Sequence, residues 1–196
     1  MTRFLCALVA LCLLAIPATA AAPDDLPDGL HWEEWFTHSS LDLQQDFAEA
    51  KAEGKHLMIV VEQQACVYCK TLHEVNFQRD EVVRATRDNF RVILMDLWGD
   101  RIVTDLDGDR LPESAFMRKW GVNTTPSMIA ISTETTPELA AHLPELFRLP
   151  GYLKPFYHVA VLDYFLADPM IEMDFSTWFK ARIAQAETDG IDPERW

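Results

Sequence analysis

The chain has 196 residues, of which 49% are hydrophobic and 24% are charged. This size fits one domain with some additions, and the apolar fraction supplies a sizeable core and excludes a disordered chain. Asp and Glu outnumber Lys and Arg by 31 to 17, so the net charge of −14 disfavours nucleic acid and anionic membrane surfaces as partners.

The first 20 residues have the pattern of a secretory signal peptide. Arg3 precedes an uninterrupted apolar run, and Pro17 then leads into the small residues Ala-Thr-Ala. We therefore predict a signal peptide over residues 1–20, cleaved after Ala20, and hence an exported protein. The alternatives are an uncleaved membrane anchor, for which the run is short of the roughly 20 residues that a spanning helix needs, and a lipid anchor on Cys12, which lacks a small preceding residue.

Export changes the set of available cysteines. Cys6 and Cys12 leave with the signal peptide, so the mature chain keeps only Cys66 and Cys69. Disulfides persist in oxidising compartments, and small exported domains often use several as staples. This chain has no second pair, so we expect core packing to carry its stability and no stray thiol to mispair with the couple.

From residue 21 onwards, predicted helices alternate with predicted strands. Residues 21–40 form an acidic leader, and we expect its aromatic residues to fold back onto the core rather than to form a ligand-binding patch. Ser40 is placed to cap the first helix. In chain order the periodicity predicts a helix over 41–55, a strand over 56–62, a helix over 69–89 with a break near Asp80, a strand over 90–97, a hairpin turning at Asp107-Gly108, a helix over 113–122, a strand over 123–132, a surface insertion over 133–146, a strand over 147–152 and a helix over 153–168. This order predicts an α/β fold with a central mixed sheet flanked by helices.

Cys66 and Cys69 form a CxxC motif where a buried strand gives way to a helix. Free N–H groups at a helix N-terminus carry partial positive charge, so the pKa of Cys66 should fall below about 8.5, the value of a free cysteine. The thiolate is the attacking species in disulfide exchange. Cys69 lies one turn into the helix, where it can resolve a mixed disulfide. The spacing therefore predicts Cys66 as the nucleophile and Cys69 as the resolving cysteine.

The same pair permits other interpretations. A zinc site commonly needs two further ligands, and the sequence has no second CxxC. His73 shares a helix face with Cys69 and could complete a copper or zinc site, but we expect it to be a solvated histidine that tunes the thiols. A purely structural disulfide is disfavoured because so small a ring constrains the unfolded chain little. We therefore expect no metal and no cofactor.

The residues Thr124, Thr125 and Pro126 stand at the start of the third strand. Proline cannot donate a ladder hydrogen bond, so it belongs at an interruption of a sheet. A cis Thr125–Pro126 bond would turn the chain sharply and leave the backbone of Thr125 free to pair with a substrate strand. An ordinary trans proline at a strand end is the alternative.

These segments, in this order, resemble the thioredoxin superfamily. HLMIVVEQQACVYCKTLHE, FRVILMDL, WGVNTTPSMIAI and RLPGYLKPFYHVAVLDYF correspond to its active-site strand and helix, middle strand, cis-proline strand and last strand–helix unit. LHEVNF, WGDRIVTDLDGD, KWGV, TPS and LPGYLKPF are similar to the SoxW-type group of periplasmic thioredoxins. The resemblance implies a thioredoxin fold with Cys66 exposed, Cys69 shielded and a cis Pro126 beside them. It also implies reduction of protein disulfides, or electron relay from a membrane thiol transporter, for sulfur-oxidation or cytochrome-maturation proteins.

The chain departs from the thioredoxin pattern near the motif. Thioredoxins carry a buried Asp six residues before the first cysteine and a Trp directly before it, where this chain has Val60 and Ala65. Glu62 is the nearest acid and could activate Cys69 as a base if it reaches that thiol, but strand alternation leads us to expect it to face solvent. The dipeptide Val67-Tyr68 replaces Gly-Pro, and these positions affect redox poise, so the direction of electron flow stays open.

Two further segments call for a prediction. The loop DLDGD, residues 105–109, fails the EF-hand pattern because Arg110 stands where the invariant Gly belongs, so we expect a turn with solvated carboxylates. The segment after Pro169 has the pattern of an additional helix. We expect it to pack on the domain, rather than to dock a partner, through Met170, Ile171, Phe175, Trp178 and Phe179.

The sequence thus predicts a periplasmic thiol–disulfide oxidoreductase in four parts: signal peptide 1–20, leader or arm 21–40, thioredoxin-like domain 41–167, and C-terminal helix and tail 168–196. Its expected partners are protein disulfides and a membrane thiol electron donor. The alternatives are a disulfide donor or isomerase, a metallochaperone that uses Cys66, Cys69 and His73, and a non-catalytic binding module.

Overall fold

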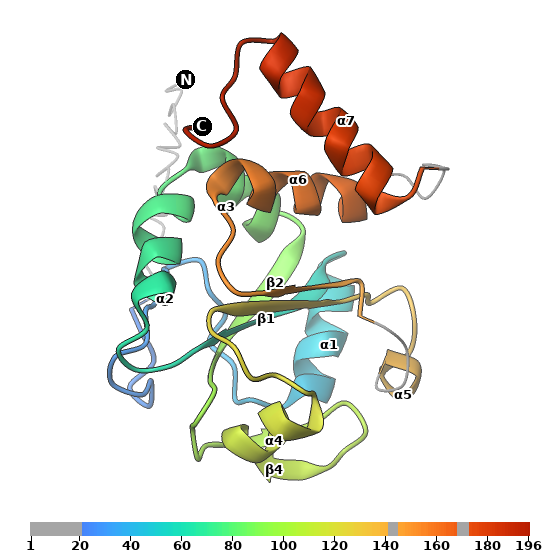
Figure 1. The fold of residues 1–196 in the computed structure, drawn as a ribbon. Coiled ribbons are helices and arrows are strands. Elements are labelled where there is room, and N and C mark those ends of the chain that lie inside the picture. Colours follow the sequence, from blue (N-terminus) through green and yellow to red (C-terminus); the bar gives the residue numbers. More distant parts are fainter. Residues whose placement is uncertain (1–20, 141–144, 168–172) are drawn as a thin grey trace, which may run out of the picture.

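A four-stranded mixed sheet with helices on both faces forms the centre of the chain (Figure 1). The computed structural model describes residues 21–140, 145–167 and 173–196, so the predicted signal peptide lies outside the described residues. The strand order is β2-β1-β5-β6, and only β1 and β2 run parallel. The strands are β1 (His56–Glu62), β2 (Phe90–Asp96), β5 (Ser127–Ile131) and β6 (Phe147–Pro150), with a separate hairpin of β3 (Ile102–Thr104) and β4 (Arg110–Pro112). The predicted mixed α/β sheet is confirmed.

The helices divide between the two faces of the sheet, as Figure 1 shows. They are α1 (Leu43–Ala52), α2 (Val67–Thr71), the π-helix η1 (Leu72–Asn76), α3 (Asp80–Arg87), α4 (Glu113–Lys119), α5 (Pro137–Ala140), α6 (Pro155–Leu166) and α7 (Phe175–Thr188). Helices α1 and α4 pack on one face, through residues such as Phe47 and Phe116. Helices α3 and α6 pack on the other, through Val82 and Leu162.

Strand β1 separates two hydrophobic cores because its side chains alternate between the faces. Leu57, Ile59 and Val61 belong to the core with α1 and α4. Met58 and Val60 belong to the core with η1, α3 and α6. Both faces of β1 are therefore covered, which agrees with its continuous apolar sequence.

The ends of α1 and of the hairpin loop differ from the predictions. Asp42, not Ser40, caps α1, because its side chain accepts the N–H groups of Gln44 and Gln45. In the loop over residues 105–109 the carboxylates are not all solvated, since Asp105 is buried. Lys119 contacts the carboxylates of Asp105, Asp107 and Asp109, so an ammonium group from this chain occupies the centre of the loop's acidic group.

Helix α7 packs on α6, as expected for an additional C-terminal helix (Figure 1). The ring of Tyr164 contacts the rings of Phe175 and Trp178, and Tyr157 contacts Phe179. The predicted contacts of Met170 and Ile171 lie outside the described residues. Among the described residues, no helix is both long and apolar enough to span a membrane.

Candidate active site

The two cysteines lie at the end of β1, where the chain turns into α2. Ala65 has a φ of 60°, a conformation that is uncommon outside glycine, and this turn places Cys66 as the N-cap of the helix. Cys66 and Cys69 are joined by a disulfide, and the N–H of Cys69 donates to the Cys66 Sγ at 3.1 Å. Cys69 is fully buried and Cys66 is partly exposed. An incoming thiol can therefore reach only Cys66, which fits the predicted roles of nucleophile and resolving cysteine.

The segment before β5 lies against the cysteine pair. The Thr125–Pro126 bond is cis, and the hydroxyl of Thr125 lies 3.4 Å from the Cys66 Sγ. Val67 and Tyr68, between the cysteines, are both largely exposed. The structure thus brings together all four of these predicted neighbours of Cys66.

A pocket of about 500 Å³ opens beside the cis peptide bond. The rings of Tyr68 and Tyr152 stack across it, with centroids 5.9 Å apart. Its lining consists of Tyr68, Thr124, Thr125, Gly151, Tyr152 and Lys154. The exposed ring of Tyr68 and the half-buried ring of Tyr152, next to a reactive sulfur, provide an apolar surface for a substrate polypeptide.

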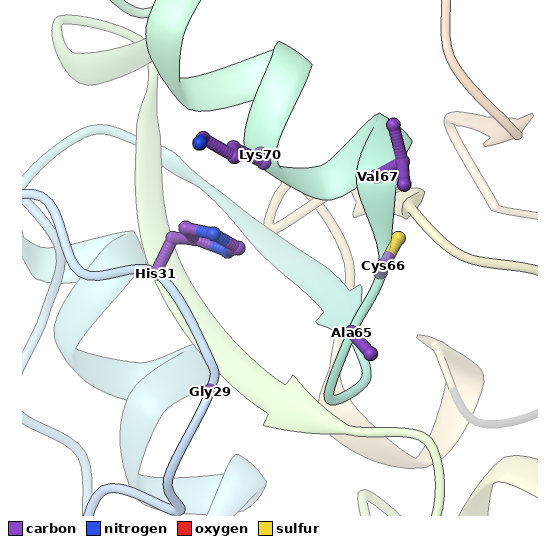
Figure 2. A pocket seen from close by; sticks show the side chains of 6 residues that line it. All are labelled: Gly29, His31, Ala65, Cys66, Val67 and Lys70. Carbon is purple, nitrogen blue, oxygen red and sulfur yellow. The ribbon is translucent and has the colours of Figure 1, made fainter.

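The N-terminal arm forms a second pocket, of about 290 Å³, on another side of Cys66. Figure 2 shows His31 of the arm pointing into this pocket, toward Cys66 at the start of α2 and Lys70 within it. The arm is held in place by aromatic packing, since Phe36 is buried and the rings of Trp35 and Phe77 lie 5.1 Å apart. The prediction that the aromatic leader folds back onto the core is confirmed.

Glu62 is fully buried, so the expectation that it faces solvent was wrong. Alternation along β1 places Glu62 on the same face as Val60, and this face is covered by the arm and η1. One oxygen of Glu62 accepts from the backbone N–H of His31 at 2.9 Å and lies 3.0 Å from its Nδ1. The other oxygen lies 2.8 Å from the Nε2 of His73. These contacts go to histidines, and none of them goes to Cys69.

His73 is buried too, which corrects the expectation of a solvated helix histidine. Its two ring nitrogens lie 2.7 Å from Glu33 and 2.8 Å from Glu62. Burial disfavours the imidazolium, but the two carboxylates outweigh that effect and raise the pKa of His73. Burial likewise opposes ionisation of Glu62, but the hydrogen bonds from His73 and His31 outweigh it and lower the pKa of Glu62. The result is a chain of paired groups from Glu33 through His73 and Glu62 to His31.

This arrangement does not support the metal site of Cys66, Cys69 and His73. Both sulfurs are in the disulfide, and the contacts of the His73 ring go to Glu33 and Glu62 and not to the cysteines. The sequence reasoning missed His31, Glu33 and Tyr152. His31 and Glu33 lie in an arm without regular secondary structure, so no periodic pattern in the sequence indicated that they reach the site.

Comparison with known proteins places this geometry in a family. The family model of the thioredoxin-like domain matches residues 43–166. A thioredoxin from Thermus thermophilus has a similar solved structure, with a TM-score of 0.51 and 17% identity over 64% of this chain and 85% of that chain. A thioredoxin-fold protein from Helicobacter pylori has a TM-score of 0.46 and 19% identity over 69% of this chain and 86% of that chain. No curated protein is significantly similar in sequence.

Proposed function

The chain belongs to the thioredoxin-like domain family and is a thiol–disulfide oxidoreductase, and we propose that it reduces protein disulfides outside the cytoplasm. One observation carries the proposal: the CxxC pair is disulfide-bonded at a helix N-terminus with Cys66 accessible and Cys69 buried. The predicted signal peptide, residues 1–20, supports export to a periplasm. The similarity to SoxW-type thioredoxins supports service to sulfur-oxidation or cytochrome-maturation proteins.

The reaction begins from the reduced protein. The Cys66 thiolate attacks one sulfur of the substrate disulfide, the substrate S–S bond breaks, and the leaving thiolate takes a proton. Cys69, once deprotonated, then attacks the Cys66 sulfur of the mixed disulfide and releases the second substrate thiol. Two electrons have passed to the substrate, and the protein is left with the Cys66–Cys69 disulfide that the structure shows. A membrane thiol donor would restore the dithiol.

The groups around Cys66 support this reaction in distinct ways. The helix N-terminus stabilises a thiolate on Cys66, and the Thr125 hydroxyl lies within reach of its sulfur. The backbone next to Pro126 and the rings of Tyr68 and Tyr152 offer an extended, partly apolar surface for the substrate chain.

The test uses the two single cysteine variants with insulin as the disulfide substrate. Cys69→Ser should accumulate a mixed disulfide with insulin, because the resolving thiol is missing. Cys66→Ser is the matched control and should neither trap nor reduce insulin. Trapping by Cys66→Ser, or by neither variant, would contradict the assigned roles.

The direction of electron flow is tested by the reduction potential of the pair. A value near −270 mV, roughly that of thioredoxin, supports a reductant, whereas a value near about −120 mV supports the alternative of a disulfide donor. The measurement needs only the equilibrium of Cys66 and Cys69 with a glutathione buffer, so it is independent of the physiological partner.

A further inference from the structure

Two histidines and one glutamate meet beside the cysteine pair in a cluster that disulfide exchange does not use. The Nδ1 of His31, a carboxylate oxygen of Glu62 and the Nε2 of His73 lie within 4.8 Å of one another. They come from the arm, the end of β1 and the π-helix η1. We propose that His31, Glu62 and His73 bind a divalent transition-metal ion of the zinc class.

The spacing of the three donors fits a shared ion. Two ligands that each lie about 2.1 Å from a tetrahedral zinc ion are about 3.4 Å apart. The Glu62 carboxylate lies 3.0 Å from His31 Nδ1 and 2.8 Å from His73 Nε2. The two contacts go to different oxygens of the carboxylate, and each must lengthen by about half an ångström for an ion to replace the protons that the groups share.

The donor set has the chemistry of known transition-metal sites. Two imidazoles and one carboxylate hold catalytic zinc in some hydrolases and ferrous iron in non-haem oxygenases, with the remaining positions open. Imidazole nitrogen selects zinc, copper, iron or nickel over calcium and magnesium, which prefer oxygen ligands. The group is also distinct within the described part of the chain, where no other three such side chains lie this close together.

Glu33 supplies the outer contact that a metal-binding histidine needs. Its carboxylate lies 2.7 Å from the Nδ1 of His73. When Nδ1 donates its proton to Glu33, the lone pair of Nε2 points toward Glu62 and is available to a metal. Such carboxylate–histidine pairs fix both the tautomer and the orientation of the ring. Glu33 is therefore a positioning residue of the proposed site.

The pocket beside Cys66 gives the ion a path to the cluster. Glu62 and His73 are buried, but the side chain of His31 is 31% exposed and lines that pocket (Figure 2). The ring of His31 stacks on that of His73 with centroids 5.1 Å apart, and one nitrogen of each ring lies within 3.0 Å of the Glu62 carboxylate. The charge of an ion in this place would be balanced by two carboxylates, because Glu62 contacts both imidazoles and Glu33 contacts that of His73.

The experiment measures zinc binding by calorimetry to the untagged mature protein with its disulfide intact. In this state the thiols cannot bind metal, so the result does not depend on the proposed redox function. We expect one zinc ion per chain. His31→Ala should raise the dissociation constant by at least about 100-fold, the upper end of what changes in an outer ligand contact alone cause. His38→Ala, an exposed histidine of the same arm, is the matched control and should bind zinc as the wild type does.

Two further measurements make the outcome decisive. A variant with both Cys66→Ser and Cys69→Ser should still bind one ion, and cobalt bound to it should show nitrogen and oxygen coordination without thiolate bands. Glu33→Gln should weaken binding less than His31→Ala does. The proposal is overturned if zinc fails to bind, or if it binds only when the cysteines are present and reduced.

Discussion

A buried histidine that contacts the π-helix η1 predicts a measurable pH dependence of the free energy of unfolding. His158 of α6 is fully buried, and its Nδ1 lies 3.0 Å from the side-chain Nδ2 of Asn76 in η1. Its Nε2 has no hydrogen-bond partner among the described residues. Burial therefore lowers the pKa of His158 from 6.5 to about 4.

The direction in which stability changes with pH follows from the difference in proton binding between the folded and the unfolded state. Between a pKa of 6.5 in the unfolded chain and about 4 in the folded protein, the unfolded chain takes up a proton that the folded protein does not. The stability that His158 contributes is therefore complete above 6.5 and is lost as the pH falls toward 4. Between about pH 8 and about pH 5 the loss is about 2 kcal/mol.

The assay is urea unfolding of the wild type and His158→Leu at both pH values. Carboxylates titrate equally in the two proteins, so the difference between them isolates His158. The wild type should lose about 2 kcal/mol more than His158→Leu between about pH 8 and about pH 5. His38→Leu, at an exposed histidine, should lose as much as the wild type. Equal losses in wild type and His158→Leu would refute the reasoning.

Two other predictions concern the buried glutamate and the C-terminal helix. Glu62→Gln should lower the free energy of unfolding by about 2 kcal/mol or more, because two imidazoles lose a charged acceptor, and urea unfolding beside the exposed control Glu34→Gln measures the loss. An unchanged midpoint for Glu62→Gln would contradict the buried pairing. A chain that ends at Ala167 should lose about 2 kcal/mol, because the half-buried rings of Phe175 and Phe179 leave α6. Thermal unfolding measures this loss, and an unchanged melting temperature would show that α7 does not stabilise the domain.

The strands and the cysteine pair could be predicted because their signals are local. The apolar runs of β1 and β2 are too short for most helices and have no polar face, which indicates strands buried on both sides. The place of Cys66 follows directly from the end of β1, since a cysteine after a buried strand and before a helical pattern becomes a helix cap. The cap of α1 lies two residues later than predicted. The chain turns at Leu41, which has a φ of 61°, and a leucine in a sequence does not indicate this left-handed conformation.

The electrostatic surroundings of the site could not be predicted because they depend on distant contacts. Glu62 meets His31 across 31 positions of sequence, and His73 meets Glu33 across 40. Alternation along β1 does place Glu62 on the same face as Val60. The expectation that Glu62 faces solvent rested on strand alternation alone, which does not show that the arm and η1 cover this face. The sequence shows the residue types, but the path of an irregular arm has no periodicity from which to predict it.

The arm makes it possible for this chain to bury an acid at Glu62, two residues after Val60. A carboxylate at the end of β1 needs cover and a counter-charge, because a buried charge without a partner is costly. Here His73 of η1 supplies the counter-charge, and His31 supplies both a backbone and a side-chain contact to the same carboxylate. The buried acid of this chain therefore stands two residues after Val60 on the same face, at Glu62, and its contacts go to histidines. This network reaches from β1 and η1 into residues 21–40, outside the part of the chain that the family model matches.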